Sequence, residues 1–523
     1  MEPQTECDCH PFQRSREAFE AMTARLSSSG VLRLPHGELE ELVQEEGREI
    51  LRSLLQDHLD LRGAGRVVEP VVGADDIDRT HVRVRDRKLA TIVGRVEVDR
   101  AGYLKPGTST LYPMDAELNL PEELYSHGIR KRVAIEASKS SYQETVQTVA
   151  ALTGETVGAR QAEELVDRAA HDFDAFYEDR ELAAAAEENE TAEILVLSVD
   201  QKGIVMRHQD LREATRRAAE RRKHKLSKRL SKGEKANSKR MSTVATVYTI
   251  DPFKRAPEDI VSELRGVEEL QRKLKRPRPE NKRVWASVEK EAEEVVEAAI
   301  HEGLRRDPVG KKTWVVVVDG AEKQLELIQN QAAAHDVTVI IVLDLIHVIE
   351  YLWKAVTAFH PEGTREAESW VTQRLYAILS GNASHVAAGM RRSATLRGLP
   401  PEKRKNVDVC ANYLLKYSPY LRYDEYLAKG LPIASGVIEG ACRHLVKDRL
   451  DITGARWGLK GAEAILKLRS LRSSGDFDEY WTFHLANERR RNHDQKYRAG
   501  RPPFPSSAPS QPANNRPRLK LVH

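Results

Sequence analysis

The chain has 523 residues, too many for one simple core, and its 40% hydrophobic content is enough for several globular domains. Its formal net charge of +3 is small because 83 basic residues nearly balance 80 acidic ones. The four cysteines do not form a disulfide framework, the N-terminus carries no apolar signal segment, and the longest apolar run (337–343) is far shorter than a bilayer. We therefore expect a cytoplasmic protein with no membrane partner.

The first third of the chain predicts three small modules. Residues 1–65 have helical apolar spacing, and residues 66–138 alternate in short stretches typical of a small β-rich module. Residues 139–190 predict two helices, the first capped by Ser140 or Ser141 and stopped by Gly154, the second opening at Thr156. This pattern fits a helix-turn-helix that binds DNA, and it equally fits an ordinary helical hairpin.

Residues 191–481 predict the main domain. Apolar strands are expected at 193–200, around 204–208, at 241–250, at 313–320 and at 337–343, with a helical stretch from the third strand to about 304. A helix follows each of the last two strands, a helical insertion covers 364–428, and another helix begins at Ser435. This order predicts an α/β fold with a partly parallel sheet, as in the ribonuclease-H-like arrangement. Residues 482–523 are rich in arginine, proline and serine and predict a disordered basic tail.

Three carboxylates stand at chemically meaningful places. Asp200 and Asp319 each end an apolar strand and share its inner face, where a metal ion would compensate for lost hydration. The alternative is that each caps the segment that follows. Glu439 lies early in a helix that Ser435 can cap, at the edge of the apolar stripe, and its alternative is a surface pair with Arg443.

Three carboxylates of this kind suit two-metal-ion chemistry on a phosphodiester. Two Mg²⁺ ions about 4 Å apart activate the nucleophile and stabilise the leaving oxygen, and Mg²⁺ prefers oxygen ligands. We therefore predict catalytic and metal-binding roles for Asp200, Asp319 and Glu439, with two Mg²⁺ ions, Mn²⁺ as a substitute, and no zinc.

A strongly basic segment, 207–240, holds 14 lysines and arginines against four acidic residues. Such a segment is expected to contact DNA phosphates, with an affinity that falls as salt rises. The predicted DNA-binding residues are Arg216, Arg217, Arg221, Arg222, Lys223, Lys225, Lys228, Arg229, Arg443, Lys447 and Trp457. Trp457 is included because its ring could stack on an unpaired base, and its alternative is a place in the core.

Several motifs together resemble a known family. They are D-x-K-G at 200–203, V-D-G at 318–320, D-L-I-H at 344–347, S-G-V-I-E-G-A-C-R-H-L-V-K-D-R from 435, and T-G-A-R-W-G at 453–458. They resemble bacterial insertion-sequence transposases of the ISKra type, which are DDE transposases. The resemblance covers about residues 66–481 and implies a ribonuclease-H-like core with Asp200, Asp319 and Glu439 as its triad.

The resemblance also implies the partners and the reaction. They are double-stranded DNA at the element's ends and at the target, and a homo-oligomer assembled on it, with cleavage followed by strand transfer. One departure concerns residues 102–115, where relatives carry a zinc-ribbon-like segment with cysteines and this chain has none. We therefore expect a degenerate module without zinc. A non-catalytic DNA-binding protein and a structure-selective nuclease stay as alternative functions.

The D-L-I-H motif leaves two interpretations open. Asp344 and His347 are one helical turn apart, so they could support the active site. Alternatively, Asp344 caps the helix and His347 lies on its face near Tyr351.

Overall fold

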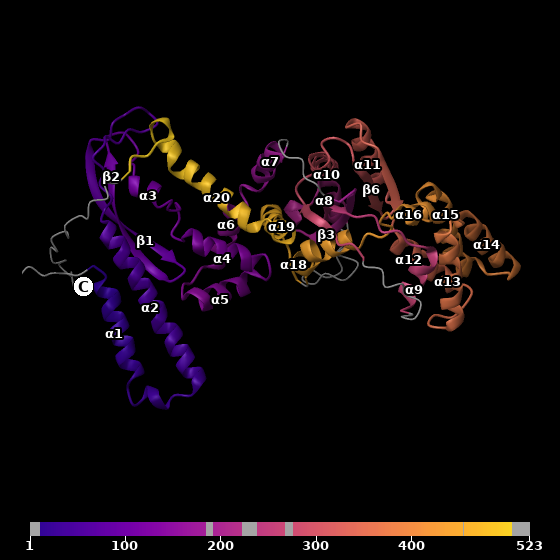
Figure 1. Cartoon of the computed structure of the whole chain (residues 1–523), viewed down its shortest axis with the longest axis horizontal. Coiled ribbons are helices and arrows are strands. Elements are labelled where there is room, and N and C mark those ends of the chain that lie inside the picture. The colour runs from indigo at the N-terminus through magenta and orange to yellow at the C-terminus, as the bar shows by residue number, and fades with distance from the viewer. Residues whose placement is uncertain (1–10, 185–191, 222–237, 267–275, 453, 505–523) are drawn as a thin grey trace, which may run out of the picture. The chain divides into compact units, whose positions relative to one another are not determined.

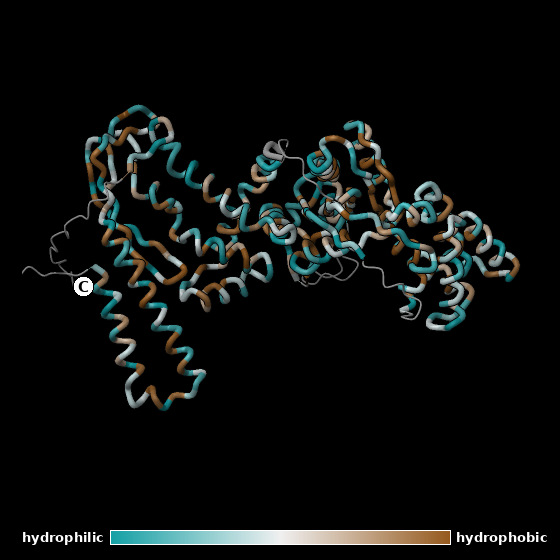
Figure 2. The backbone as a smooth tube through the Cα atoms, in the orientation of Figure 1, coloured by the Kyte–Doolittle hydropathy of each residue, from teal (hydrophilic) through white to brown (hydrophobic). Residues whose placement is uncertain are grey.

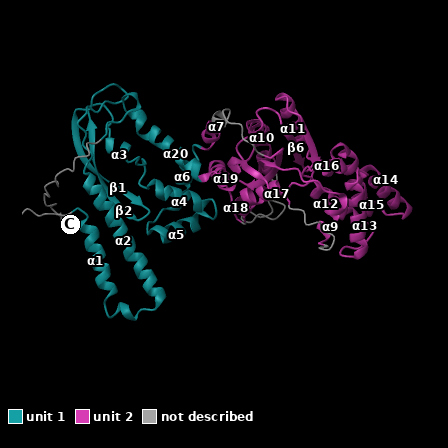
Figure 3. Cartoon of the chain, viewed as in Figure 1, with its two compact units in different colours: residues 1–172, 478–523 teal, residues 173–477 magenta. Residues whose placement is uncertain are grey.

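The computed structural model describes residues 11–184, 192–221, 238–266, 276–452 and 454–504. The chain divides into two compact units: unit 1 comprises residues 1–172 and 478–523, and unit 2 comprises residues 173–477 (Figure 3). None of the described helices combines the length and the apolar character that crossing a bilayer requires.

Unit 1 begins with two helices and a β-hairpin. Helices α1 (Gln13–Leu26) and α2 (His36–Arg62) lie side by side and alternate between hydrophilic and hydrophobic residues (Figure 2), which confirms the predicted helical region. Strands β1 (His81–Thr91) and β2 (Gly94–Leu104) form one antiparallel hairpin, as the alternating pattern predicted. The hairpin packs through Leu89, Val96 and Val98 against Leu59 of α2.

Four helices follow the hairpin in unit 1: α3 (Pro113–Glu117), α4 (His127–Ala137), α5 (Tyr142–Thr153) and α6 (Ala159–Ala169). Ser141 caps α5 in a capping box with Glu144, and Gly154 ends it with a left-handed φ of 73°, both as predicted. Helix α6 starts at Ala159 rather than at Thr156, because the fully buried Val157 anchors a non-helical connection ahead of it.

The predicted disordered tail is wrong for residues 482–504. Helix α20 (Phe477–Asn492) and the short helices η7 (Asp494–Lys496) and η8 (Arg498–Gly500) continue the fold. Within unit 1, the buried Arg130 donates to Glu488 at 2.6 Å, and His484 lies 2.6 Å from Asp172. Polar residues that suggested a solvated tail are thus paired in the interior. Residues 505–523 lie outside the described residues.

Unit 2 is built on a mixed five-stranded sheet with the order β5-β4-β3-β6-β7. Strand β3 pairs antiparallel with β4 and parallel with β6; β4 and β5 are antiparallel, and β6 and β7 are parallel. The strands are β3 (Ile194–Val205), β4 (Lys239–Ile250), β5 (Glu280–Ser287), β6 (Thr313–Val318) and β7 (Val339–Leu343). This confirms an α/β fold with a partly parallel sheet.

Two predictions about these strands are wrong. The two strands expected at 193–200 and 204–208 are one continuous strand, β3, in which Gly203 leaves room for the side chain of Lys239 on β4. The helical stretch expected up to about 304 contains β5, between α9 (Pro257–Arg265) and α10 (Ala292–Arg306). Only the second half of β5 is buried, and its charged first half hides the strand pattern.

Helices cover both faces of the sheet. Leu195 of β3 and Trp314 of β6 are register partners, and both approach Gly303 of α10 on one face. Asp200 points to the other face, where it meets Cys442. The remaining helices around the sheet are α7 (Phe173–Ala184), η2 (His208–Asp210), α8 (Glu213–Glu220), α11 (Glu322–Ala334), α12 (Leu345–Val356), α17 (Gly436–Ala441), α18 (Asp448–Leu450) and α19 (Leu459–Ser474).

The predicted helical insertion is confirmed as helical. It consists of α13 (Arg365–Leu379), α14 (Ala383–Leu396), α15 (Pro401–Lys416) and α16 (Tyr423–Lys429). These helices lie together at one end of unit 2 (Figure 1) and pack mainly on α12 and on one another. Between α17 and α18, residues Cys442–Lys447 form a π-helical turn, η6, where the sequence predicted a regular α-helix.

Candidate active site

The two predicted aspartates lie at the same edge of the sheet. The parallel ladder between β3 and β6 ends with Ser198 opposite Val317, and Asp200 and Asp319 each follow two residues later. Because side chains alternate along a strand, this register directs Asp200 and Asp319 toward the same face of the sheet, on adjacent strands. Both residues are partly buried. The next strand in the sheet, β7, ends at Leu343, so Asp344 reaches the same edge.

Asp344 is fully buried, and its hydrogen bonds connect the end of β7 with the starts of α12 and α17. Its Oδ1 accepts from the backbone N–H groups of Ile346, at 3.1 Å, and Ser435, at 3.2 Å. Its Oδ2 accepts from His347 Nδ1 at 3.0 Å and from the Ser435 hydroxyl. Asp344 therefore caps α12, as one interpretation of the sequence predicted, and it also fixes the start of α17, which carries Glu439.

This arrangement corrects the prediction for Ser435. The residue occupies the N-cap position of α17, yet its side chain makes no capping bond to that helix. The hydroxyl donates instead to Asp344, 91 residues earlier in the chain. The link between the end of β7 and the start of α17 thus depends on a buried carboxylate and a serine hydroxyl.

Asp344, His347 and Glu439 form a close group, with one ligand atom from each lying within 4.8 Å of the others. The hydrogen bond to Asp344 raises the pKa of His347, and the negative charge of Asp319 adds to this effect. Partial burial raises the pKa of Glu439, and the charges of Asp344 and, more weakly, Asp200 act in the same direction. The two members of the predicted pair, Asp200 and Asp319, are not part of this close group.

Asp200 has a partner that the sequence analysis missed. Its Oδ2 accepts a hydrogen bond from the thiol of Cys442 at 3.1 Å, and its Oδ1 accepts from the backbone N–H of Gln201 at 2.6 Å. Burial and the charge of Asp200 raise the pKa of Cys442, so the thiol stays protonated and able to donate. Cys442 opens the π-helical turn; such turns are frequent at functional sites. No local pattern in the sequence could have indicated this contact.

Tyrosines of the helical insertion hold the ends of β6 and β7. Four hydroxyls donate to backbone carbonyls there: Tyr413 to Asp319 at 2.9 Å, Tyr417 to Gly320, Tyr423 to Leu343 at 2.7 Å, and Tyr426 to Ile341 at 3.2 Å. The ring of Tyr413 also stacks on Tyr351 of α12, with the centroids 4.0 Å apart. The insertion thereby fixes the backbone on which two of the carboxylates stand.

The predicted DNA-binding residues are only partly described. Arg216 and Arg217 lie on α8, where Arg217 pairs with Glu213, and Arg221 follows the helix. Arg443 and Lys447 are exposed on the π-helical turn, and the Nε of Arg443 lies 3.6 Å from Asp448 rather than near Glu439. Five predicted residues lie outside the described residues: Arg222, Lys223, Lys225, Lys228 and Arg229.

Trp457 occupies the core, which was the alternative to stacking on a base. It is 8% exposed, and its indole N–H donates to the Leu450 carbonyl at 3.1 Å. Its backbone pairs with the end of β3, with Trp457 N–H donating to Val205 at 3.0 Å and Arg207 N–H donating to Trp457 at 2.7 Å. Trp457 therefore anchors the segment that leads into α19, and its ring is largely buried.

Comparison with known protein families and with curated proteins gives no match to this chain. Carboxylates on or just after three neighbouring strands and on one helix lie in this region. The pKa of Glu439 is raised first by partial burial, and repulsion from the charges of Asp344 and Asp200 adds to the shift. A divalent cation with oxygen ligands would relieve this repulsion, so the residues fit a metal site of the Mg²⁺ type.

Proposed function

We propose that this protein is a DDE-type DNA transposase that cuts DNA and joins the freed 3′-hydroxyl to a target, using two Mg²⁺ ions on a ribonuclease-H-like core. The observation that carries the proposal is the position of Asp200 and Asp319, which both lie two residues beyond the last paired residues of the parallel ladder between β3 and β6. Glu439 reaches the same region on a helix tied to Asp344. The mixed sheet, with β4 antiparallel and β6 parallel to β3, supports such a core.

Asp200, Asp319 and Glu439 would hold the metal ions, and Asp200 is the central member because its strand lies in the middle of the sheet. When bound, the ions would supply an activated nucleophile and stabilise charge on the leaving oxygen.

The other residues of the edge would position these ligands. Asp344 holds the start of α17 and so sets where Glu439 lies. The Cys442 thiol fixes one oxygen of Asp200. His347 directs Nδ1 to Asp344, which leaves Nε2 to donate a hydrogen bond to a phosphate oxygen of the DNA. Because this histidine carries a raised pKa, it would keep a positive charge near the phosphate over a wider pH range.

DNA recognition would involve both units. In unit 1, α5 and α6 with their short connection would read the element's ends, packed on α4 as a three-helix cluster. In unit 2, Arg216, Arg217 and Arg221 would contact phosphates, with Arg443 and Lys447 on the π-helical turn. Joining two ends requires the protein to assemble as a homo-oligomer on DNA.

The decisive test is an assay of cleavage and joining on labelled DNA that carries the element's ends, in Mg²⁺ or in EDTA. Wild type is compared with Asp200→Ala, Asp319→Ala and Glu439→Ala, and with Glu368→Ala as a control on the exposed surface of α13. Joining that depends on Mg²⁺ and is lost in the three variants, with DNA binding retained, would support the proposal.

Two other outcomes would replace the proposal. Cleavage without joining would indicate a nuclease, and binding without cleavage by the wild type would indicate a non-catalytic DNA-binding protein.

A further inference from the structure

A polar cavity lies in unit 2, toward the opposite end of the strands from the carboxylates. It has a volume of about 420 Å³, and Thr249 of β4 lines it. Thr249 pairs with Leu195 near the start of β3, whereas Val244 pairs with Asp200. The cavity is therefore separate from the candidate active site by about five residues of strand, or roughly 17 Å.

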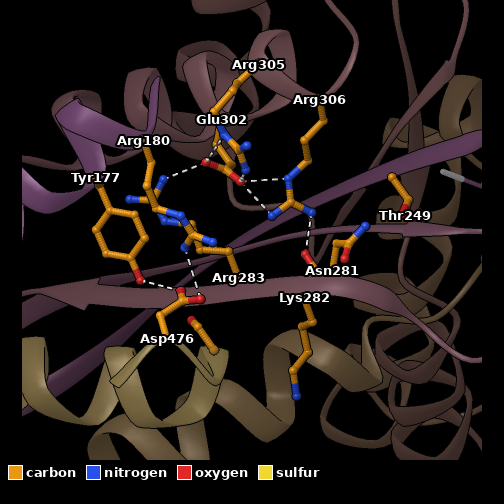
Figure 4. A pocket seen from close by; sticks show the side chains of 11 residues that line it. Tyr177, Arg180, Thr249, Asn281, Lys282, Arg283, Glu302, Arg305, Arg306 and Asp476 are labelled. Atoms are coloured by element: carbon orange, nitrogen blue, oxygen red, sulfur yellow. Dashed lines mark hydrogen bonds and ion pairs between the residues drawn. The ribbon is translucent and has the colours of Figure 1, made fainter. Parts of the chain in front are cut away.

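Arginines dominate the wall of this cavity (Figure 4). Arg180 comes from α7, Arg283 from β5, and Arg305 and Arg306 from the end of α10. The side chains of Arg283 and Arg306 are only 10% and 8% exposed. Lys282 also lines the cavity, but its side chain points away from this group in Figure 4.

Two carboxylates oppose the four guanidinium groups. The buried Glu302 accepts from Arg283 Nη1 at 2.7 Å, from Arg305 Nη2 at 2.7 Å and from Arg306 Nε at 2.6 Å. Asp476 pairs with Arg180 at 3.0 Å. Two positive charges therefore remain in excess. Excess charge that is largely withdrawn from water is costly unless an anion compensates for it.

The guanidinium groups are held in fixed positions. The Arg283 group lies 3.6 Å from the ring centroid of Tyr177 and 4.6 Å from that of Trp285, and its Nε is buried with no acceptor. Glu302 takes up one side of the Arg305 fork, through Nε and Nη2. Rigid planar forks of this kind recognise phosphate by paired, charge-assisted hydrogen bonds.

We propose that this cavity binds a phosphate-bearing ligand, with Arg305 and Arg180 as the residues that receive it. They are the two arginines of the cavity with the more exposed side chains, 20% and 34%, so they can meet a ligand that enters from solvent. The volume exceeds that of one phosphate and accommodates a diphosphate or a nucleotide-sized compound. The phosphate could belong to a free compound or to the end of a DNA strand. This inference does not depend on the proposed transposase activity.

The test is calorimetric titration of the full-length protein with pyrophosphate in EDTA, so that metal at the carboxylate edge plays no part. We expect one equivalent to bind to the wild type, and about tenfold weaker binding to Arg305→Ala, since a charge-assisted pair is lost. Arg180→Ala provides a second variant at a more exposed position. Arg391→Ala on α14, whose Nε lies 3.7 Å from Asp408, is the matched control and should bind as the wild type does.

A competition experiment separates the two sources of phosphate. Displacement of pyrophosphate by a short 5′-phosphorylated oligonucleotide, and not by its unphosphorylated form, would assign the site to a DNA end. Pyrophosphate that stays bound would assign it to a free phosphorylated compound. Absence of pyrophosphate binding to the wild type, or undiminished binding to both folded arginine variants, would overturn the inference.

Discussion

Replacing Asp344 by asparagine should destabilise unit 2 by about 3 kcal/mol at pH 6. The amide can keep the two backbone hydrogen bonds that Oδ1 accepts from Ile346 and Ser435. At Oδ2, however, an NH₂ group would face the donors of His347 and Ser435. Two charge-assisted hydrogen bonds are then lost, each contributing about 1.5 kcal/mol.

The loss should depend on pH in a defined direction. In the folded protein the pKa of His347 is raised, chiefly by its hydrogen bond to Asp344, above the ordinary value of 6.5. The stabilisation from this pair is therefore complete below pH 6.5 and declines as pH rises through the raised pKa. The difference in unfolding free energy between wild type and Asp344→Asn should consequently be larger at pH 6 than at pH 9.

Urea unfolding followed by tryptophan fluorescence measures this difference, since five of the six tryptophans belong to unit 2. Glu368→Gln on α13 is the control, because Glu368 is exposed; it should change stability by less than about 0.5 kcal/mol. Equal stability of wild type and Asp344→Asn at both pH values would refute the assigned role of Asp344.

Three further substitutions test other parts of the fold. Gly303→Ala should destabilise unit 2 by about 1–3 kcal/mol, because the added Cβ would lie 2.4 Å from the indole of Trp314. Gly389→Ala, on a helix surface with no atom near the added Cβ, should stabilise the protein by about 0.5–1 kcal/mol in the same urea assay. Glu488→Gln should destabilise unit 1 by roughly 2 kcal/mol at pH 7. Burial opposes ionisation of Glu488, but the buried arginine beside it lowers its pKa to about 2, so the wild type loses stability as pH falls from 4.5 to 2. Acid unfolding curves should show that the variant lacks this loss. Tyr413→Phe should cost about 1 kcal/mol and lower strand transfer about tenfold at unchanged DNA binding, because the carbonyl of Asp319 loses its donor; full joining activity would contradict this role.

The sequence predicted the parts of the fold that have a local signature. Strand β6 and the first half of β3 are mainly apolar runs, so they were recognised, and the aspartates that follow these runs marked the candidate site. Strand β5 was missed because its first three residues are exposed and polar. Its Arg283 is buried against Glu302 and Tyr177, which come from elsewhere in the fold.

The contacts that shape the site could not be predicted either, because they join residues that are far apart in the sequence. The bond from Ser435 to Asp344 spans 91 residues and that from Cys442 to Asp200 spans 242, so neither leaves a periodic or spacing signal. Local reasoning gave Ser435 the role of a helix cap, which its position favours. The folded chain uses its hydroxyl elsewhere because a fully buried carboxylate needs donors more than a solvated helix end does.

The tyrosines of the insertion also supply hydrogen-bond donors to polar groups that need them. A sheet that displays carboxylates at the ends of its strands must end its backbone ladder there, and the carbonyls of Asp319 and Leu343 then need donors from outside the sheet. Hydroxyls from α15 and α16 satisfy these two carbonyls, and the ring of Tyr413 stacks on that of Tyr351. The insertion between α12 and α17 is therefore part of the scaffold of the site. The tyrosine hydroxyls of the insertion, together with the sheet, hold Asp319 and Asp344 in register.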